Sequence, residues 1–241
     1  MANVYAGTSG WSYASWKPEF YPAKLPSARF LGYYASRLNT VEVNYTFRRY
    51  VTAKTLAGWM EQTPAGFRFS VKAHQFITHV KRLREAQEPT RRFLETLGPL
   101  VDSGRLGVVL FQLPPFLRAD TALLEDFLAA LPGRAVVRPA FEFRHPTWLD
   151  EAVYEILRRH NAALCVAESE DFETPDVATA GFCYYRFRKP EYDAARLGAI
   201  ERMLGAHRDA GRDIFAYFKH EDTPAGALSA EGLLRKLQSA P

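Results

Sequence analysis

The segment AVVRPAFEFRHPTW, residues 135–148, starts as an apolar run and ends in a cluster of polar side chains. Glu142, Arg144 and His145 occur within four positions, and the proline that follows them cannot continue a strand ladder. The next segment, residues 148–160, spaces its apolar side chains along one face of a helix. Together they predict a strand that delivers three polar groups at its C-terminal end and is followed directly by a helix.

The same strand-then-helix unit recurs along the chain. Short β-branched or aromatic runs alternate with longer segments of helical spacing, a pattern typical of parallel βαβ units. We predict strands at residues 3–7, 40–44, 67–72, 106–112, 135–142, 163–168, 181–187 and 214–219. We predict helices at residues 27–38, 52–63, 119–131, 148–160 and 194–210.

Eight such strands in 241 residues favour one fold. A TIM-like (β/α)8 barrel usually takes roughly 250 residues, and no Pro/Gly/Ser-rich linker or low-complexity tract divides this chain. We therefore predict an α/β fold, a single barrel domain over residues 1–241. The alternative is a doubly wound open sheet, which normally has a GxGxxG turn after its first strand; the turn GTSGWSY at residues 7–13 lacks that spacing.

Composition indicates the setting in which the protein works. The formal net charge of +4 permits an anionic ligand without requiring a nucleic-acid partner. Cys165 and Cys183 lie in apolar runs, so we expect reduced, buried thiols rather than a disulfide or a metal pair. The chain has no long uncharged apolar span, and its first residues do not resemble a secretory signal. We therefore expect a cytoplasmic protein without membrane contacts.

Polar residues gather at one end of the predicted barrel. In TIM barrels the C-terminal strand ends and the loops after them build the active site. Glu42 and Lys72 stand out because each interrupts an apolar run, and such residues are rarely buried unless paired. Arg188 and Glu168 are explained by the general rise in polarity where a chain reaches solvent. The candidate site residues are Trp11, Glu42, Asn44, Lys72, His79, Gln112, Glu142, Arg144, His145, Arg186 and Lys219.

Five ordered blocks of sequence carry a resemblance to a known family. They are GTSGWSYASWKPEFYP (7–22), LNTVEVNYTFRR (38–49), FRFSVKAHQFITH (67–79), VLFQLPPF (109–116) and FEFRHPTW (141–148). Together they closely resemble the domain of unknown function 72 family, also called YecE-like. The resemblance covers essentially the whole chain and implies a TIM-like β/α barrel, but it carries no established reaction. The family's blocks place Trp11, Glu42, Asn44, Lys72, His79, Gln112, Glu142, Arg144 and His145 at matching positions.

The last third of the chain departs from that family. After the seventh strand the family usually has arginine, a variable residue and then His-Gly, whereas this chain has Arg186 and then Phe-Arg-Lys. At the eighth strand the family often has Phe-Asn-Asn, and this chain has Phe218, Lys219 and His220. Cationic groups replace amides, which favours a more anionic ligand.

The first functional hypothesis is a barrel enzyme acting on a phosphate-bearing or otherwise anionic substrate. Lys72, Arg144, Arg186 and Lys219 would hold the anion, while Trp11, Asn44, His79 and Gln112 complete the binding site. Glu42 or Glu142 would be the general base or acid, with His145 or His79 as its partner. TIM barrels often bind phosphate after strands seven and eight, where the cationic departures lie. We expect no cofactor and no tightly bound transition metal.

Other hypotheses remain open. Residues 79–92 supply five lysines and arginines, and aromatic residues near the mouth could stack bases, so a nucleic-acid enzyme or binder is the second. An ion-paired, solvated helix face explains residues 79–92 equally simply. A metal-dependent hydrolase using Glu42, Glu142, His145 and Glu168 is the third, although no established ligand spacing supports it. A glycosidase with Glu42 and Glu142 as its carboxylate pair is weaker, and a non-catalytic sensor is the last.

Overall fold

The computed structural model describes residues 2–132, 137–168, 173–189, 191–219 and 223–239. Eight parallel strands form one sheet in the order β1-β8-β7-β6-β5-β4-β3-β2. The strands are β1 (Val4–Thr8), β2 (Thr40–Val43), β3 (Arg68–Lys72), β4 (Leu106–Gln112), β5 (Pro139–Glu142), β6 (Ala163–Ala167), β7 (Phe182–Phe187) and β8 (Asp213–Phe218). The first and last strands are paired neighbours, so the predicted TIM-like barrel is confirmed.

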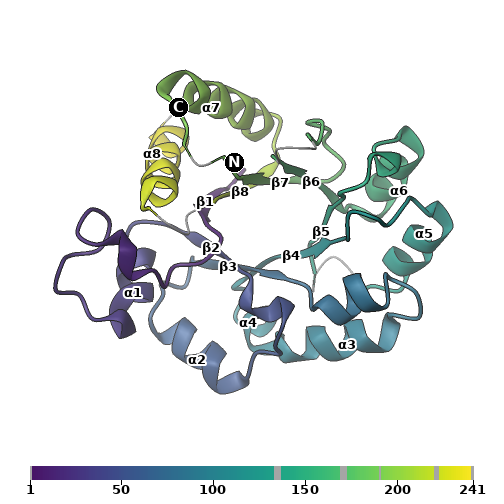
Figure 1. Cartoon of the computed structure of the whole chain (residues 1–241), viewed down its shortest axis with the longest axis horizontal. Coiled ribbons are helices and arrows are strands. Elements are labelled where there is room, and N and C mark those ends of the chain that lie inside the picture. Colours follow the sequence, from purple (N-terminus) through teal and green to yellow (C-terminus); the bar gives the residue numbers. More distant parts are fainter. Residues whose placement is uncertain (1, 133–136, 169–172, 190, 220–222, 240–241) are drawn as a thin grey trace.

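Helices surround the strands as an outer ring (Figure 1). The α-helices are α1 (Phe30–Ala35), α2 (Ala53–Glu61), α3 (Gln87–Thr96), α4 (Gly98–Asp102), α5 (Thr121–Ala129), α6 (Glu151–His160), α7 (Ala194–Asp209) and α8 (Ala225–Ser239). Short helical turns are η1 (Ala14–Trp16), η2 (Ser27–Arg29), η3 (Tyr45–Phe47), η4 (Phe76–Val80) and η5 (Pro146–Trp148). Between β6 and β7 the described residues contain no helix, so this connection departs from the strand-helix alternation.

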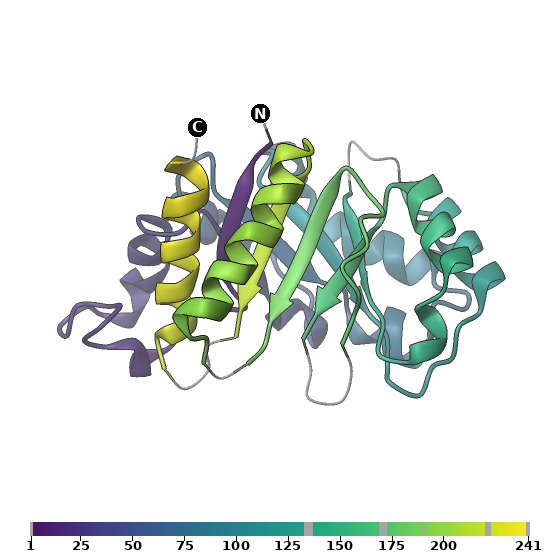
Figure 2. The ribbon, with the colours of Figure 1, turned by 90° about the horizontal axis from the view of Figure 1, so that it is seen from above.

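The two-residue period of the strands separates the inside of the barrel from its outside. On β2, Val41 and Val43 pack in the core between the sheet and the helices, while Glu42 points inward to side chains of β7. The strands all point toward one end of the barrel (Figure 2). A second apolar cluster fills the inside and comprises Tyr5, Val108, Leu110, Ala140, Ala163, Cys165, Ala167, Phe182, Tyr184, Phe215 and Tyr217.

Hydroxyl groups line part of the barrel interior. The Tyr217 hydroxyl lies 2.8 Å from Thr40 Oγ1 and donates to Ser70 Oγ at 2.8 Å. Ser70 Oγ in turn accepts a hydrogen bond from the backbone N–H of Val108 at 3.0 Å. Along the barrel axis, toward the C-terminal strand ends, the inward side chains thus change from apolar to hydroxyl-bearing and then to charged.

One amide side chain bridges β1 and β2. Among the described strands, β1 has a backbone ladder with β8 but none with β2. Asn39 precedes β2, and its Oδ1 accepts from the Ala6 N–H at 3.1 Å while its Nδ2 donates to the Val4 carbonyl at 2.7 Å. The Asn39 amide therefore substitutes for the missing strand partner.

A buried hydroxyl completes the same β1–β2 seam. Tyr34 from α1 donates to the Thr40 carbonyl at 2.9 Å and accepts from the Thr8 N–H at 2.8 Å. The strands come so close that a Cβ at Gly7 would lie 2.1 Å from the Thr40 carbonyl oxygen. Glycine is therefore required at this position, because any side chain would force the seam apart.

Most predicted elements are confirmed, and the differences are local. Seven of the eight strands begin and end within one residue of their predicted positions. The predicted strand at 135–142 begins only at Pro139; residues 135–136 lie outside the described residues. The helix predicted over 27–38 is η2 followed by α1, and α3, α4 and α8 were not predicted. None of the helices in the described ranges has the length and apolar character needed to cross a bilayer.

Candidate functional site

One guanidinium lies between two carboxylates at the C-terminal end of the barrel interior. Arg186 on β7 donates from Nη2 to Glu42 Oε1 at 2.6 Å and from Nη1 to Glu142 Oε2. All three side chains are buried. Charges removed from water are stable only when they are paired and hydrogen-bonded, and the planar guanidinium can serve two carboxylates at once. Arg186 thereby joins β2, β5 and β7 through the middle of the barrel.

Side chains from β3, β4 and β7 extend this ion network. Gln112 donates from Nε2 to Glu142 Oε1 at 2.7 Å, and its Oε1 accepts from the Lys72 ammonium at 2.7 Å. The Tyr184 hydroxyl donates to Glu42 Oε2 at 2.7 Å. Each glutamate oxygen therefore has a named donor, and the predicted convergence of these strand ends on one place is what the structure shows.

The arginines keep both glutamates ionised. Burial alone raises the pKa of the Glu42 carboxyl, but the charge and hydrogen bond of Arg186 outweigh it and hold the pKa below its ordinary value. Burial is likewise overcome at Glu142, where the charges of Arg186, Arg188 and Arg144 hold the pKa well below the usual range. Both groups are therefore counter-charges at neutral pH, with no proton to donate.

The ion network is the first tier of the site, and a second tier of polar side chains lies nearer the barrel mouth. Asn44 donates from Nδ2 to Glu42 Oε1 at 3.2 Å, and Arg144 donates from Nε to Glu142 Oε1 at 3.0 Å. Burial and the neighbouring charge of Arg186 lower the pKa of Arg188. Two buried atoms of this tier, Arg188 Nε and Asn44 Oδ1, have no hydrogen-bond partner among the described residues.

The two tiers form the floor of a pocket of about 580 Å³. Half of its lining residues are cationic, and no aspartate or glutamate from the described part of the chain lines it. Four of these cations, Lys72, Arg144, Arg186 and Arg188, lie beside the two buried glutamates. This inner part of the site therefore carries four positive charges against two negative ones. The cationic lining residues are Arg48, Arg49, Lys72, Arg144, Arg186 and Arg188.

Lys72 is the titratable group of this pocket. Burial, and then the nearby positive charge of Arg186, lowers the pKa of its ammonium to about 8. The ammonium lies 4.0 Å from the centre of the Phe47 ring, a cation–π contact that helps to hold it in place. Lysine in such surroundings can give and take a proton near neutral pH.

Four predicted site residues lie away from this floor. Trp11 lines a neighbouring pocket rather than the cationic one. His79 packs edge-on against Phe47 at 5.0 Å, and burial together with the charges of Lys72 and Arg144 lowers its pKa.

His145 and Lys219 also lie away from the floor, and their positions do not match the roles predicted for them in acid–base chemistry and anion binding. The Nδ1 atom of His145 accepts from the Thr147 N–H at 3.2 Å and caps the turn η5, so its visible contact is structural. Lys219 is exposed after β8. Among the described residues, neither of them lines the cationic pocket.

A metal site finds no support in the residues that the structure describes. No three His, Cys, Asp or Glu side chains in those ranges come together as metal ligands. Glu168, a ligand in the metal-hydrolase hypothesis, binds Arg196 at 2.7 Å and the Tyr192 hydroxyl instead. Cys165 and Cys183 are free, buried thiols whose pKa values are raised by burial.

The basic stretch at 79–92 is mostly paired within the protein. Arg91 binds Glu88 at 2.7 Å and also Glu95 along α3. Arg84 binds Asp120 at 2.9 Å. The Arg91 pairs fit the solvated helix face, whereas Arg84 lies in the turn before α3. This pairing within the protein makes nucleic-acid binding by the stretch less favoured.

Arg48, Arg49 and Arg188 line the pocket but are not among the residues predicted for the site, and of these Arg188 lies beside the buried glutamates. Its charge was attributed to the approach of the chain to solvent, yet it lines the pocket beside Arg144. The missed signal is the two-residue period, because Arg188 follows the inward-facing Arg186 by two positions, as Arg144 follows Glu142.

Comparison with known sequences connects this chain to a family. A family model described as "Protein of unknown function DUF72" matches residues 5–241. The UPF0759 protein YunF of Bacillus subtilis is 29% identical over 156 residues, 63% of this chain and 54% of YunF. The UPF0759 protein YecE of Escherichia coli K12 is 32% identical over 144 residues, 59% of this chain and 49% of YecE. The chain thus spans about half the length of these curated relatives.

Solved structures share the whole barrel. The crystal structure of a DUF72 family protein from Thermotoga maritima has a TM-score of 0.86 and 25% identity, and it covers 98% of this chain and 100% of its own. A DUF72 family protein from Enterococcus faecalis has a TM-score of 0.81 and 15% identity, with coverage of 99% and 96%. The second likeness is one of fold alone.

Proposed function

The chain belongs to the DUF72 family of proteins of unknown function, and from its cationic pocket we propose that it is an enzyme acting on a phosphate-bearing or other anionic substrate. The observation that carries this proposal is the charge of the pocket. Lys72, Arg144, Arg186 and Arg188 face two glutamates, which leaves two positive charges without a counter-charge in the inner site. A phosphate monoester dianion supplies the missing two negative charges.

The three arginines at the floor of the pocket have different roles in binding such an anion. Arg186 donates to both Glu42 and Glu142, so it serves as the scaffold of the site. Arg144 uses only its Nε on Glu142, and 41% of its side chain is exposed, so its remaining donors are available to a ligand. Arg188 adds a buried donor that is without a partner among the described residues. These two form the anion clamp of the proposal.

Lys72 is the proton-transfer group in this proposal. Glu42 and Glu142 are held ionised by Arg186, so the acid–base roles first considered for them pass to the amine at the pocket wall. Its pKa of about 8 lies close to the working pH, where a general acid or base is most effective. Gln112 fixes its position through the hydrogen bond to Nζ.

Titration with inorganic phosphate tests the clamp. We expect binding by isothermal titration calorimetry, and Arg144→Lys and Arg188→Lys should each weaken it by at least about tenfold, since loss of a charge-assisted hydrogen bond costs roughly 1.5–3 kcal/mol. Arg158→Lys on α6, an exposed arginine paired with Glu151, is the matched control and should change nothing. Equal effects of all three substitutions, or no phosphate binding to the wild-type protein, would remove the basis of the proposal.

Phosphorus-31 NMR spectroscopy tests catalysis separately from binding. A panel of phosphate monoesters is incubated with the protein, and conversion of one of them should cease in Lys72→Met. That variant should still bind phosphate through Arg144 and Arg188, but more weakly, because one positive charge of the pocket is lost. A reaction that stays absent when the variant is saturated with the ester identifies Lys72 as the proton-transfer group.

A further inference from the structure

A second pocket of about 320 Å³ adjoins the cationic one. It is lined by four aromatic residues, Trp11, Tyr13, Tyr45 and Trp59, and no charged residue from the described ranges lines it. Four residues, Ser9, Tyr13, Asn44 and Tyr45, line both pockets. The two pockets are therefore the halves of one cleft, and we call them the aromatic half and the cationic half.

The aromatic half is firmly built. The Trp11 ring meets the Trp59 ring edge-on at 5.4 Å, and Trp59 is stacked on Phe69 of β3 at 5.6 Å. Gly10 has a φ of +126°, and a Cβ there would lie 2.6 Å from the Tyr13 hydroxyl. A planar ligand thus meets a preformed aromatic surface, which lowers the ordering cost of binding.

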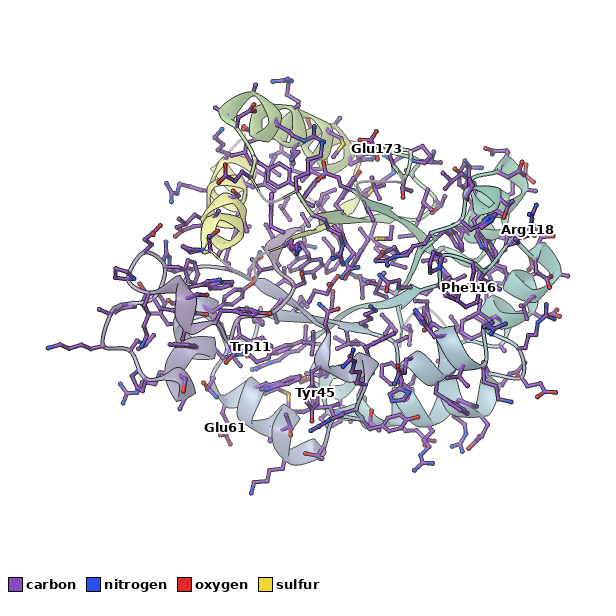
Figure 3. All side chains as sticks on the ribbon, viewed as in Figure 1. Trp11, Tyr45, Glu61, Phe116, Arg118 and Glu173 are labelled. Carbon is purple, nitrogen blue, oxygen red and sulfur yellow. The ribbon has the colours of Figure 1, made fainter. Side chains whose placement is uncertain are left out.

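Tyr45 stands at the junction of the two halves. Its side chain is 51% exposed, in contrast to the buried aromatic residues of the core. Tyr45 and Trp11 lie near one another at the same side of the barrel mouth, whereas the exposed Phe116 lies across the mouth (Figure 3). A large exposed ring beside a pocket is a surface on which a second ring can stack.

Asn44 adds a specific polar contact at the same junction. Its Nδ2 donates to the ionised Glu42, which orients the amide and leaves Oδ1 facing away from that carboxylate. That oxygen is buried and has no donor among the described residues. The Asn44 Oδ1 atom accepts hydrogen bonds, in contrast to the cationic side chains around it. It therefore suits a hydroxyl or amine of the ligand, placed between the ligand's aromatic part and its anionic group.

We propose that the cleft binds a nucleoside phosphate, with the base in the aromatic half, a sugar hydroxyl at Asn44 and the phosphate in the cationic half. The inference rests on the proposed anion site and adds the chemical class of its ligand. A base stacks on Tyr45 and Trp11, while Arg144 and Arg188 bind the phosphate. A free mononucleotide and the 5′-phosphate end of a single strand share this chemistry.

Calorimetric titration with inorganic phosphate, adenosine monophosphate and adenosine distinguishes the two halves. We expect the monophosphate to bind at least tenfold more tightly than phosphate, because stacking adds to the anion contacts. Tyr45→Ala should weaken monophosphate binding about tenfold more than it weakens phosphate binding, and Tyr45→Phe should restore the difference. Phe116→Ala, which removes an exposed ring that lines neither half, is the control.

The outcomes separate this inference from the function on which it rests. Phosphate binding with no gain for the monophosphate, or with no effect of Tyr45→Ala, overturns the nucleoside assignment and leaves the anion site standing. Absence of binding by both ligands overturns both. Tighter binding of a short 5′-phosphorylated single strand, still dependent on Tyr45 and Arg144, supports the same chemistry with a nucleic-acid end as its source.

Discussion

Glu142 is the residue on which most contacts of the ion network converge. It accepts from Arg186, Gln112 and Arg144. Glu142→Gln should lower the free energy of unfolding by about 3 kcal/mol, because Glu42 is then the one carboxylate left to balance the buried Arg186 and the cations beside it. Urea denaturation measures this loss. Glu151→Gln, which breaks an exposed pair with Arg158, is the control and should cost less than about 1 kcal/mol; equal losses would contradict a special role for the buried pair.

Lys72 gives the anion site a pH dependence. Its pKa of about 8 lies below the ordinary lysine value, so the amine loses its charge as pH rises through about 8. Affinity for sulfate, whose own charge is constant there, should fall from pH 7 to pH 9, and Lys72→Arg should remove most of that fall. Stability moves in the opposite direction: above pH 8 the unfolded state binds more protons than the folded state, so the free energy of unfolding rises toward the unfolded pKa. A sulfate affinity that is constant over this range would exclude Lys72 from the site.

Among the elements, β1 depends on side chains for its attachment to β2. Asn39→Ala removes the two hydrogen bonds to Val4 and Ala6, and it should cost about 1–3 kcal/mol because buried backbone groups lose their partners. Amide exchange should speed up in β1 more than in β4, which lies within the sheet between β3 and β5. Gln62→Ala removes an exposed amide that bonds only within α2 and should leave β1 unchanged. Protection of β1 that is the same in both variants would show that the seam does not hold it.

The elements also show what could be predicted from sequence. Apolar runs identified all eight strands, since alternation needs only local information. The α3 helix was missed because Pro89 lies within its sequence, although proline is tolerated in a first turn. The α8 helix contains two glycines and several small residues, so its helical periodicity is weak, and packing against β1 supplies what propensity lacks.

The site was predictable only in part, because some of its features follow from local sequence and others depend on the closed barrel. Glu42, Lys72, Gln112, Glu142 and Arg186 share the inward parity at strand ends, and parity can be counted along a sequence. The pairing of Arg186 with two glutamates from distant strands depends on barrel closure, which no local pattern contains. The same holds for the division into aromatic and cationic halves, because their linings come from segments separated along the chain.

The whole barrel should become more stable when the pocket is occupied. A ligand at a hundred times its Kd adds about 2.7 kcal/mol to the free energy of unfolding. For a chain of this size each kcal/mol raises Tm by roughly 2–4 °C, so saturating sulfate should raise Tm by about 5–10 °C. Differential scanning calorimetry in sulfate and in chloride of equal ionic strength measures the difference. Equal Tm values in the two salts would indicate general screening rather than a bound anion.

The seam between β1 and β2 has a consequence for how the chain is made. Val4 pairs with Ile214, so the ladder partner of the first strand is synthesised long after that strand. Until then the Asn39 and Tyr34 side chains supply the hydrogen bonds that hold β1 beside β2. Nascent chains that end before β8 should therefore carry β1 without its ladder partner, with its unpaired backbone open to chaperones. Barrel closure therefore has to wait until β8 has been synthesised, and α8 then packs against β1.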